Sequence, residues 1–163
     1  MLTKIISGGQ TGADQGALAA AKELGIPTGG TAPKGYRTDT GNNFDLCLTY
    51  GLSASPHRDY GPRTKENVIS SDGTLLFGSR SLLISTGTRL TERICFAHNK
   101  PNIHIHWLSG EILANHDEIP QFLNWLRNNN IQVLNVAGNR ERTNPGIFQA
   151  TKDFLIEALR GAC

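Results

Sequence analysis

The segment KIISGGQTGADQGALAAAKELG (residues 4–25) places a short strand, a glycine turn and a helix in immediate succession. A strand is predicted that ends with Ile5 and Ile6, because β-branched residues favour extended backbone and glycines follow them. After the glycines, alanine and leucine recur at helical spacing until Gly25 and Pro27 end the helix. A strand that enters a helix through so short a turn is typical of a parallel sheet with helices on its faces.

The alternation of strands and helices continues along the chain. A short strand is expected within residues 26–33, and a long loop rich in Gly, Pro, Thr, Asn and Asp at 33–61. Periodicity then predicts helices at 62–71, 85–100 and 117–130, a last helix capped by Asn144 and Pro145, and strands at 74–78, 102–108 and 131–138. At 163 residues, these elements predict one α/β domain with a doubly wound, mostly parallel sheet.

Composition excludes several classes of partner. The formal net charge is +2 and 18% of the residues are charged, so no strong field favours nucleic acid or anionic lipid. The chain begins MLTKII, with no charged leader before an apolar stretch, and no eighteen apolar residues run uninterrupted, which predicts a cytoplasmic protein without a membrane partner. Cys47, Cys95 and Cys163 lack CxxC spacing and are expected to be reduced thiols that form no zinc site.

The glycine turn at residues 8–12 predicts an anion site. Ligands of parallel sheets lie at the carboxyl ends of the strands, where Gly8, Gly9 and Gly12 allow the backbone to approach a phosphate and aim helix N–H groups at it. Any tight turn between strand and helix needs one glycine. Three within five residues, flanked by the hydroxyls of Ser7 and Thr11, favour binding, and Gly12→Val is expected to abolish it without disturbing the fold.

The turn matches neither of the two common phosphate motifs. The lysine and hydroxyl of GxxxxGK[ST] are absent, and the spacing is GGxxG instead of GxGxxG. No acidic residue follows about twenty positions later to hold a ribose, which argues against NAD. Asp14 lies in the first turn of the helix, where it either stabilises the helix or contacts a ligand hydroxyl or cation.

The segment STGT (residues 85–88) opens a second helix in the same way. Gly87 permits close approach, and Ser85, Thr86 and Thr88 offer hydroxyls, although Thr88 also suits a simple N-cap. Basic side chains near these turns are candidates to converge on one anionic ligand, while a solvated position is the default for each alone. They are Arg63, Lys65, Arg80, Arg89 and Arg140.

Few other residues suggest chemistry. Glu92 and Asp72 are the carboxylates best placed for catalysis, and both also suit structural roles. His104 and His106 share one face of a strand, but no third ligand follows at a matching spacing, so no metal bound directly by the protein is expected. Their polar face predicts a strand near the edge of the sheet or in a part of the sheet that is incompletely covered.

Five segments resemble the molybdenum carrier family, which belongs with the circularly permuted YpsA-like proteins. These belong to a superfamily of Rossmann-like domains that includes the lysine-decarboxylase-like, cytokinin-activating proteins and the DNA-processing protein DprA. The segments span nearly the whole chain: KIISGGQTGADQGAL, GIPTGGTAPKGYRTDTG, RTKENVISSDGTLLF, GTRLTE and LNVAGNRERTNPGIFQATKDFL.

The resemblance implies a Rossmann-like three-layer α/β sandwich that binds a nucleotide or a similar ligand. The name of the family implies that the ligand is the molybdenum cofactor, molybdopterin. This is a pterin phosphate whose own dithiolene sulfurs hold the metal. The residues that match the first glycine motif of the family are Gly8, Gly9, Gln10, Thr11 and Gly12, and Thr86, Gly87 and Thr88 resemble the glycine-threonine turn of the superfamily. Phosphoribohydrolase relatives carry PGGxGTxxE, whereas STGTRLTE lacks the double glycine and places Glu92 one position late, which argues against hydrolase chemistry.

Three classes of function follow. The favoured class is a carrier that grips a small phosphate-bearing ligand with glycine turns, hydroxyls, Arg63 and Arg140. The alternative is a nucleotide hydrolase that cleaves an N-glycosidic bond, with Glu92 or Asp14 beside the sugar. The third is an oligomeric scaffold with a vestigial pocket. A homo-oligomer is expected. Trp125 lies on a wide apolar arc of its helix, where it packs either against a partner chain or in the core of its own domain.

Overall fold

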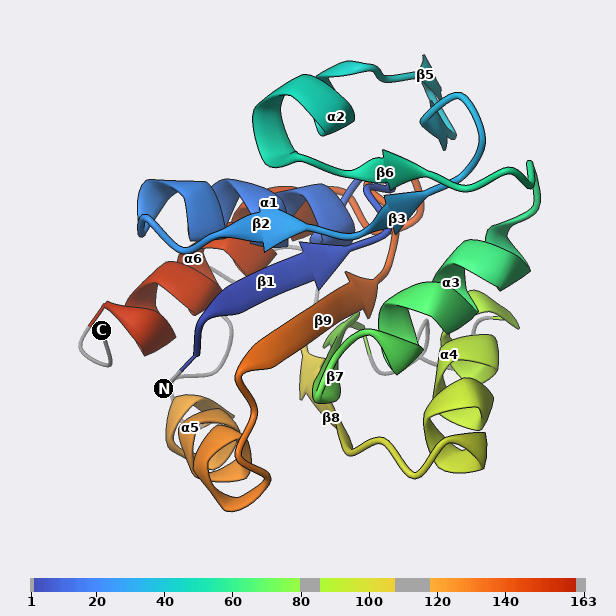
Figure 1. Cartoon of the computed structure of the whole chain (residues 1–163). Coiled ribbons are helices and arrows are strands. Elements are labelled where there is room, and N and C mark those ends of the chain that lie inside the picture. The colour runs from blue at the N-terminus through green and yellow to red at the C-terminus, as the bar shows by residue number, and fades with distance from the viewer. Residues whose placement is uncertain (1, 80–85, 108–117, 161–163) are drawn as a thin grey trace.

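The computed structural model describes residues 2–79, 86–107 and 118–160. Its centre is a five-stranded sheet in the order β2-β1-β9-β7-β8, in which every neighbouring pair is parallel (Figure 1). The strands are β1 (Lys4–Ser7), β2 (Thr28–Gly29), β7 (Gly73–Gly78), β8 (Asn102–His106) and β9 (Val133–Gly138). The polar strand β8 lies at an edge, which confirms the prediction from its alternating histidines.

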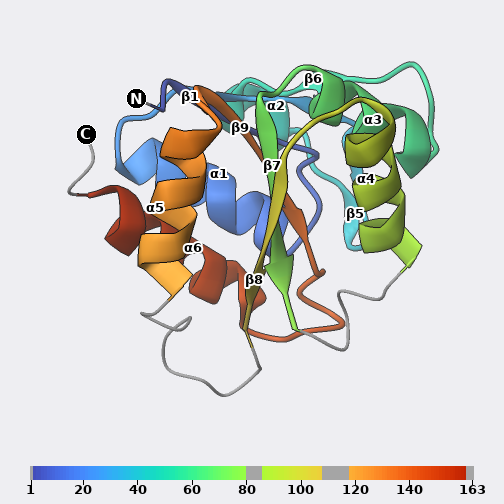
Figure 2. The same cartoon turned by 90° about the horizontal axis from the view of Figure 1, so that it is seen from below.

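Helices cover both faces of this sheet. The helices α1 (Ala13–Glu23), α5 (Glu118–Asn128) and α6 (Ile147–Leu159) lie on one face, and α3 (Tyr60–Ile69) and α4 (Thr86–Ala97) lie on the other (Figure 2). This arrangement confirms the predicted Rossmann-like three-layer α/β sandwich. Among the described residues, no helix has the length and apolar character needed to cross a membrane.

The two faces of the sheet differ in chemistry. Side chains alternate along a strand, and those of Leu75, Phe77, Leu134 and Val136 belong to the main apolar core with α1, α5 and α6. The residues between them on β7 and β9, such as Asn135, therefore face the α3–α4 layer. Polar groups buried there must find partners, so this second interface is built partly from hydrogen bonds.

Residues 30–59 form a small ordered lobe, which corrects the predicted loop at 33–61. The lobe contains β3 (Thr31–Ala32), β4 (Arg37–Thr38), β5 (Gly41–Asn42), α2 (Asp45–Tyr50) and β6 (Ser53–Ala54). Leu46 and Leu52 are fully buried against Leu18 of α1 and Ala32, forming a second apolar cluster. This small cluster holds the lobe against α1 although the segment has few apolar residues.

Two helix starts differ from the predicted ones. The helix α3 begins at Tyr60, two residues before Pro62, which fits inside a first turn because no intrahelical partner is lost there. The helix α6 begins at Ile147 after Gly146, which has φ 92°, instead of being capped by Asn144 and Pro145.

The ring of Trp125 packs within its own chain. It stacks on Phe122 with 6.3 Å between ring centroids, and it lies so close to Gly73 that a Cβ there would be 2.9 Å from its Cη2. Its side chain is half-buried against the main core. Packing within its own chain therefore explains the position of Trp125 without a partner chain. The homo-oligomer stays a prediction.

Candidate ligand pocket

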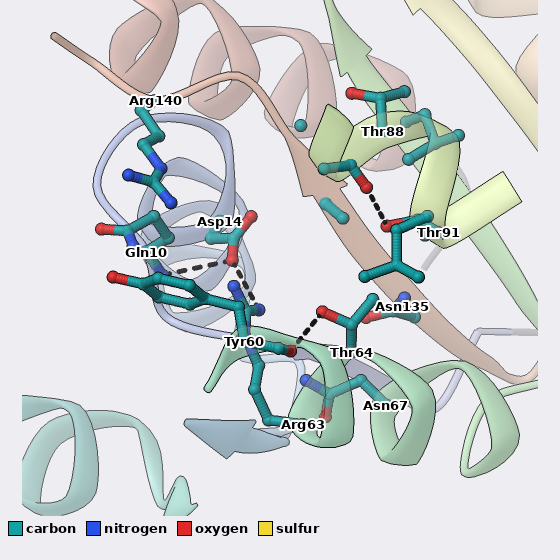
Figure 3. A pocket seen from close by; sticks show the side chains of 16 residues that line it. Gln10, Asp14, Tyr60, Arg63, Thr64, Asn67, Thr88, Thr91, Asn135 and Arg140 are labelled. Carbon is teal, nitrogen blue, oxygen red and sulfur yellow. Dashed lines mark hydrogen bonds and ion pairs between the residues drawn. The ribbon is translucent and has the colours of Figure 1, made fainter. Parts of the chain in front are cut away.

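One pocket of about 100 Å³ opens at the carboxyl edge of the sheet, between the sheet and the α3–α4 layer. The segments after β1 and β9 and the start of α4 contribute to it, as the sequence predicted for turns that share one edge (Figure 3). Seven of the predicted site residues line the pocket: Gly8, Gln10, Asp14, Arg63, Gly87, Thr88 and Arg140.

Gly9, Thr11 and Gly12 do not line the pocket, and each has a packing role. A Cβ on Gly9 would lie 2.8 Å from Leu46, and a Cβ on Gly12 would overlap with the backbone of residues 139–141. Both glycines have positive φ, at 71° and 89°. The Thr11 hydroxyl donates to Asp39 at 2.6 Å. Gly12→Val would therefore disturb the fold, which corrects the expectation that it leaves the fold intact.

Several candidate residues lie elsewhere. Glu92 does not line the pocket but pairs with His104 on β8, with 2.9 Å between Oε1 and Nε2. Asp72 lies before β7, at the amino end of the sheet, where it accepts hydrogen bonds from the backbone N–H groups of Gln132 and Val133. Lys65 and Arg89 are exposed and do not line the pocket.

Two further candidates, Arg80 and Ser85, lie outside the described residues, and Thr86 is described only as the first residue of α4.

The side-chain amide of Gln10 is held in one orientation. Its Oε1 accepts hydrogen bonds from the backbone N–H groups of Thr11 at 3.1 Å and Asp39 at 2.9 Å. The amide nitrogen Nε2 is buried and has no acceptor within the described part of the chain. A buried donor without a partner costs about 1–3 kcal/mol, so this fixed N–H₂ group marks a place for an acceptor on a ligand.

Asp14 and Arg63 form an ion pair beside Gln10. The Asp14 Oδ2 atom accepts from Arg63 Nη1 at 3.4 Å and from the backbone N–H of Gln10 at 3.1 Å. Burial raises the pKa of the Asp14 carboxyl, and the nearby Arg63 charge and the hydrogen bonds oppose this only in part. The Arg63 guanidinium lies directly over Gly8, because a Cβ on Gly8 would overlap with its Nη1. Its Nε, like Gln10 Nε2, lacks a partner among the described residues.

Uncharged polar side chains line the deeper part of the pocket. They come from α3, α4 and β9, and they are Thr64, Asn67, Thr88, Thr91 and Asn135 (Figure 3). Asn67 is held by two hydrogen bonds to the backbone of Thr31, at 2.8 and 2.9 Å. The Asn135 amide donates to Thr74 at 3.2 Å. This chemistry suits a ligand with its own donors and acceptors rather than an apolar one.

Tyr60, which sequence reasoning missed, lines the mouth of the same pocket. The guanidinium of Arg140 lies 5.0 Å from its ring centroid, that of Arg63 5.6 Å, and that of Arg37 5.8 Å. Of these three arginines, Arg63 and Arg140 were predicted and Arg37 was not. Asn135 was missed as well, although the sequence offered a signal for it: it is an amide within an otherwise apolar strand and lines the pocket.

Fold and pocket together define a Rossmann-like α/β protein with a polar pocket at the carboxyl edge of its sheet. Residues 5–159 match the model of the circularly permutated YpsA SLOG family, and the chain belongs to that family. It is similar to a solved structure named "Putative molybdenum carrier protein" from Syntrophus aciditrophicus SB, with a TM-score of 0.84 and 41% sequence identity over 94% of this chain and 92% of that chain. No curated protein matches the chain.

Proposed function

We propose that this protein is a carrier that binds a small phosphate-bearing ligand, either the pterin phosphate of the molybdenum cofactor or a nucleotide. The observation that carries the proposal is the fixed amide of Gln10, whose buried Nε2 lacks an acceptor among the described residues, beside the Arg63 guanidinium over Gly8. Charge-assisted hydrogen bonds from such donors suit a phosphate. The name of the similar structure, a molybdenum carrier, favours a molybdenum-related ligand.

The chemistry of the donor set fits the phosphate end of molybdenum cofactor. Gln10 and Arg63 would hold the phosphate, while the deeper amides and hydroxyls would contact the polar edge of the pterin. The metal itself would stay on the dithiolene sulfurs of the pterin, so the chain need not supply a metal ligand. When bound, the cofactor would supply the molybdenum centre, and the protein would protect and deliver it.

The size of the pocket limits how the ligand enters. Sites for ligands of this size commonly measure about 300–1,000 Å³, whereas the pocket measures about 100 Å³ with the Arg63 guanidinium in it. The Arg63 guanidinium is the end of a long, flexible side chain, and its contacts are a 3.4 Å ion pair with Asp14 and the ring of Tyr60. Its displacement toward the ligand would open the space over Gly8 at the same time as it provides a cation for the phosphate.

The hydrolase alternative now depends on Asp14. Asp14 is the one carboxylate among the described residues that line the pocket, since Glu92 pairs with His104 elsewhere. The Asp14 carboxylate would have to break its ion pair with Arg63 before it could act on the sugar of a nucleotide. Release of free base from a nucleoside monophosphate would favour this alternative, and its absence during prolonged incubation would favour the carrier.

Native mass spectrometry and calorimetric titration with molybdopterin, nucleoside monophosphates and inorganic phosphate test the proposal. Gln10→Glu is the sharpest variant, because it keeps the Oε1 acceptor for two backbone N–H groups but replaces the free donor with an anionic oxygen. We expect affinity for the bound ligand to fall at least tenfold. A thermal midpoint for the variant checks that it is folded, since the new carboxylate is buried close to Asp14. Undiminished affinity in Gln10→Glu, or no binding of any tested ligand, would refute the proposal.

A further inference from the structure

Three cations surround the ring of Tyr60, which lines the pocket. Arg63 and Arg140 line the pocket as well, whereas Arg37 is exposed beside it. The guanidiniums of Arg37, Arg63 and Arg140 all lie between 5.0 and 5.8 Å from the ring centroid of Tyr60. They come from β4 of the small lobe, from α3, and from the segment after β9, so only the folded chain assembles them. Figure 3 shows Arg63 and Arg140 approaching Tyr60 from different sides, with Gln10 and Asp14 between them.

Attraction to the ring does not explain this cluster. A cation is attracted to the face of an aromatic ring and repelled by its positive edge, and a ring has only two faces. All three guanidiniums lie over the ring, so at least two of them share a face. The guanidiniums also repel one another, and at the surface of a protein this repulsion is moderate but unfavourable.

The carboxylates nearby do not balance the three charges. Asp14 pairs with Arg63 at 3.4 Å, and Asp39 accepts from the neutral Thr11 hydroxyl at 2.6 Å, so two carboxylates stand against three guanidiniums. Within residues 2–79, 86–107 and 118–160, the structure gives no ion pair to Arg37 or Arg140. The cluster thus holds excess positive charge beside the buried donor of Gln10.

We infer that the ligand carries two linked phosphates. This inference rests on the proposed function: the first phosphate would be held by Gln10 and Arg63 over Gly8, and the second by Arg37 and Arg140 at Tyr60. The ligand class is a diphosphate, such as a nucleoside diphosphate or a pterin joined to a nucleotide through a diphosphate. Arg37 and Arg140 then select diphosphates over monophosphates.

Calorimetric titration of the full chain at fixed pH and ionic strength tests the inference with four probes: inorganic phosphate, inorganic pyrophosphate, AMP and ADP. Inorganic phosphate and pyrophosphate carry no base or sugar, so a difference between their affinities comes from the second phosphate alone. We expect the unmodified protein to bind the diphosphate of at least one pair about tenfold or more tightly than its monophosphate. Arg37→Gln and Arg140→Gln should each lower diphosphate affinity about tenfold, with a change of about twofold or less for the monophosphate.

Exposed arginines near the cluster provide matched controls. Arg58 lies two residues before Tyr60 and Arg142 two residues after Arg140, and both are exposed. Arg58→Gln and Arg142→Gln remove the same charge and should leave the preference for diphosphates unchanged. A thermal midpoint measured for each variant shows whether it is folded.

Three results would overturn the inference. Equal affinity for monophosphate and diphosphate would mean that the ligand carries one phosphate, and the proposed function would stand. Equal losses in the variants and in the controls would mean that only the overall field attracts the anion. Failure of the unmodified protein to bind any of the four probes or molybdopterin would refute the proposed function and the inference together.

Discussion

The contact between Arg63 and Gly8 leads to a stability prediction that can be worked out from the structure. Gly8 has no positive φ, so its backbone accepts alanine, but the new Cβ would overlap with Nη1 of Arg63. Every heavy atom outside the Arg63 side chain is at least 3.1 Å from that Cβ position. Gly8→Ala therefore does one thing, which is to move the Arg63 guanidinium away from Asp14.

The expected loss of stability is moderate. Breaking a buried ion pair costs about 3–5 kcal/mol when a charge stays buried and unpaired. Here the Arg63 side chain is 11% exposed and can turn toward water, and burial already favours the protonated form of Asp14 by raising its pKa. We expect Gly8→Ala to lower the free energy of unfolding by about 1–3 kcal/mol, or the thermal midpoint by about 2–10 °C for a domain of this size.

A second pocket glycine gives a matched control. Gly87 lies in the first turn of α4, and a Cβ there would meet no atom of the described residues within 4 Å. Gly87→Ala should therefore raise the free energy of unfolding by about 0.5–1 kcal/mol, since alanine restricts the unfolded chain and favours helix. Urea unfolding followed by circular dichroism measures both variants.

A double-mutant cycle separates the Arg63 contact from any other effect of the methyl group. In an Arg63→Ala background, Gly8→Ala should cost less than about 0.5 kcal/mol, because the clash partner is gone. An unchanged midpoint for Gly8→Ala, or an equal cost in both backgrounds, would refute the reasoning.

Three further predictions concern titration, thiol access and association. Because burial raises the pKa of Asp14 above its ordinary 3.8, the folded state keeps this proton to higher pH than the unfolded chain does. The free energy of unfolding should therefore fall as pH rises from the pKa of Asp14 in the unfolded chain through its pKa in the folded state. In urea titrations, Asp14→Asn should remove this part of the pH dependence. Iodoacetamide followed by peptide mapping should modify exposed Cys47 well before buried Cys95, whose thiol pKa is raised by burial. Light scattering should show a homo-oligomer, and Trp125→Glu should lower the thermal midpoint, since its ring packs on the core; a monomer or an unchanged midpoint would contradict these expectations.

The order of strands and helices could be predicted from the sequence because hydrophobic periodicity reports burial directly. The strand at 74–78 and the helix at 117–130 differ from β7 and α5 only at their ends. The lobe at 30–59 could not be predicted in this way. It is held by a few buried side chains, notably Leu46 in α2 and Leu52 after it, which belong to no single helix or strand.

The pocket could be predicted in part, because parallel strands bring their carboxyl ends to one edge. That rule placed Gly8, Gln10 and Gly87 together without any contact information. It could not assign roles within a turn: Gly9 and Gly12 look the same as Gly8 in the sequence, yet they face Leu46 and the segment after β9. Arg37 was missed because its approach to Tyr60 depends on how the lobe folds back.

The chemistry of the sheet explains why the pocket lies between the sheet and the α3–α4 layer. The face toward α1, α5 and α6 is filled by the main apolar core, whereas the opposite face carries buried polar groups such as Asn135. A layer joined through polar contacts gains less from burial than an apolar one. A bound ligand would contact α3 through Arg63, α4 through Thr88 and the sheet through Asn135. Ligand binding would therefore stabilise the less apolar interface of the domain, and hydrogen exchange should slow most in α3 and α4 when ligand is added.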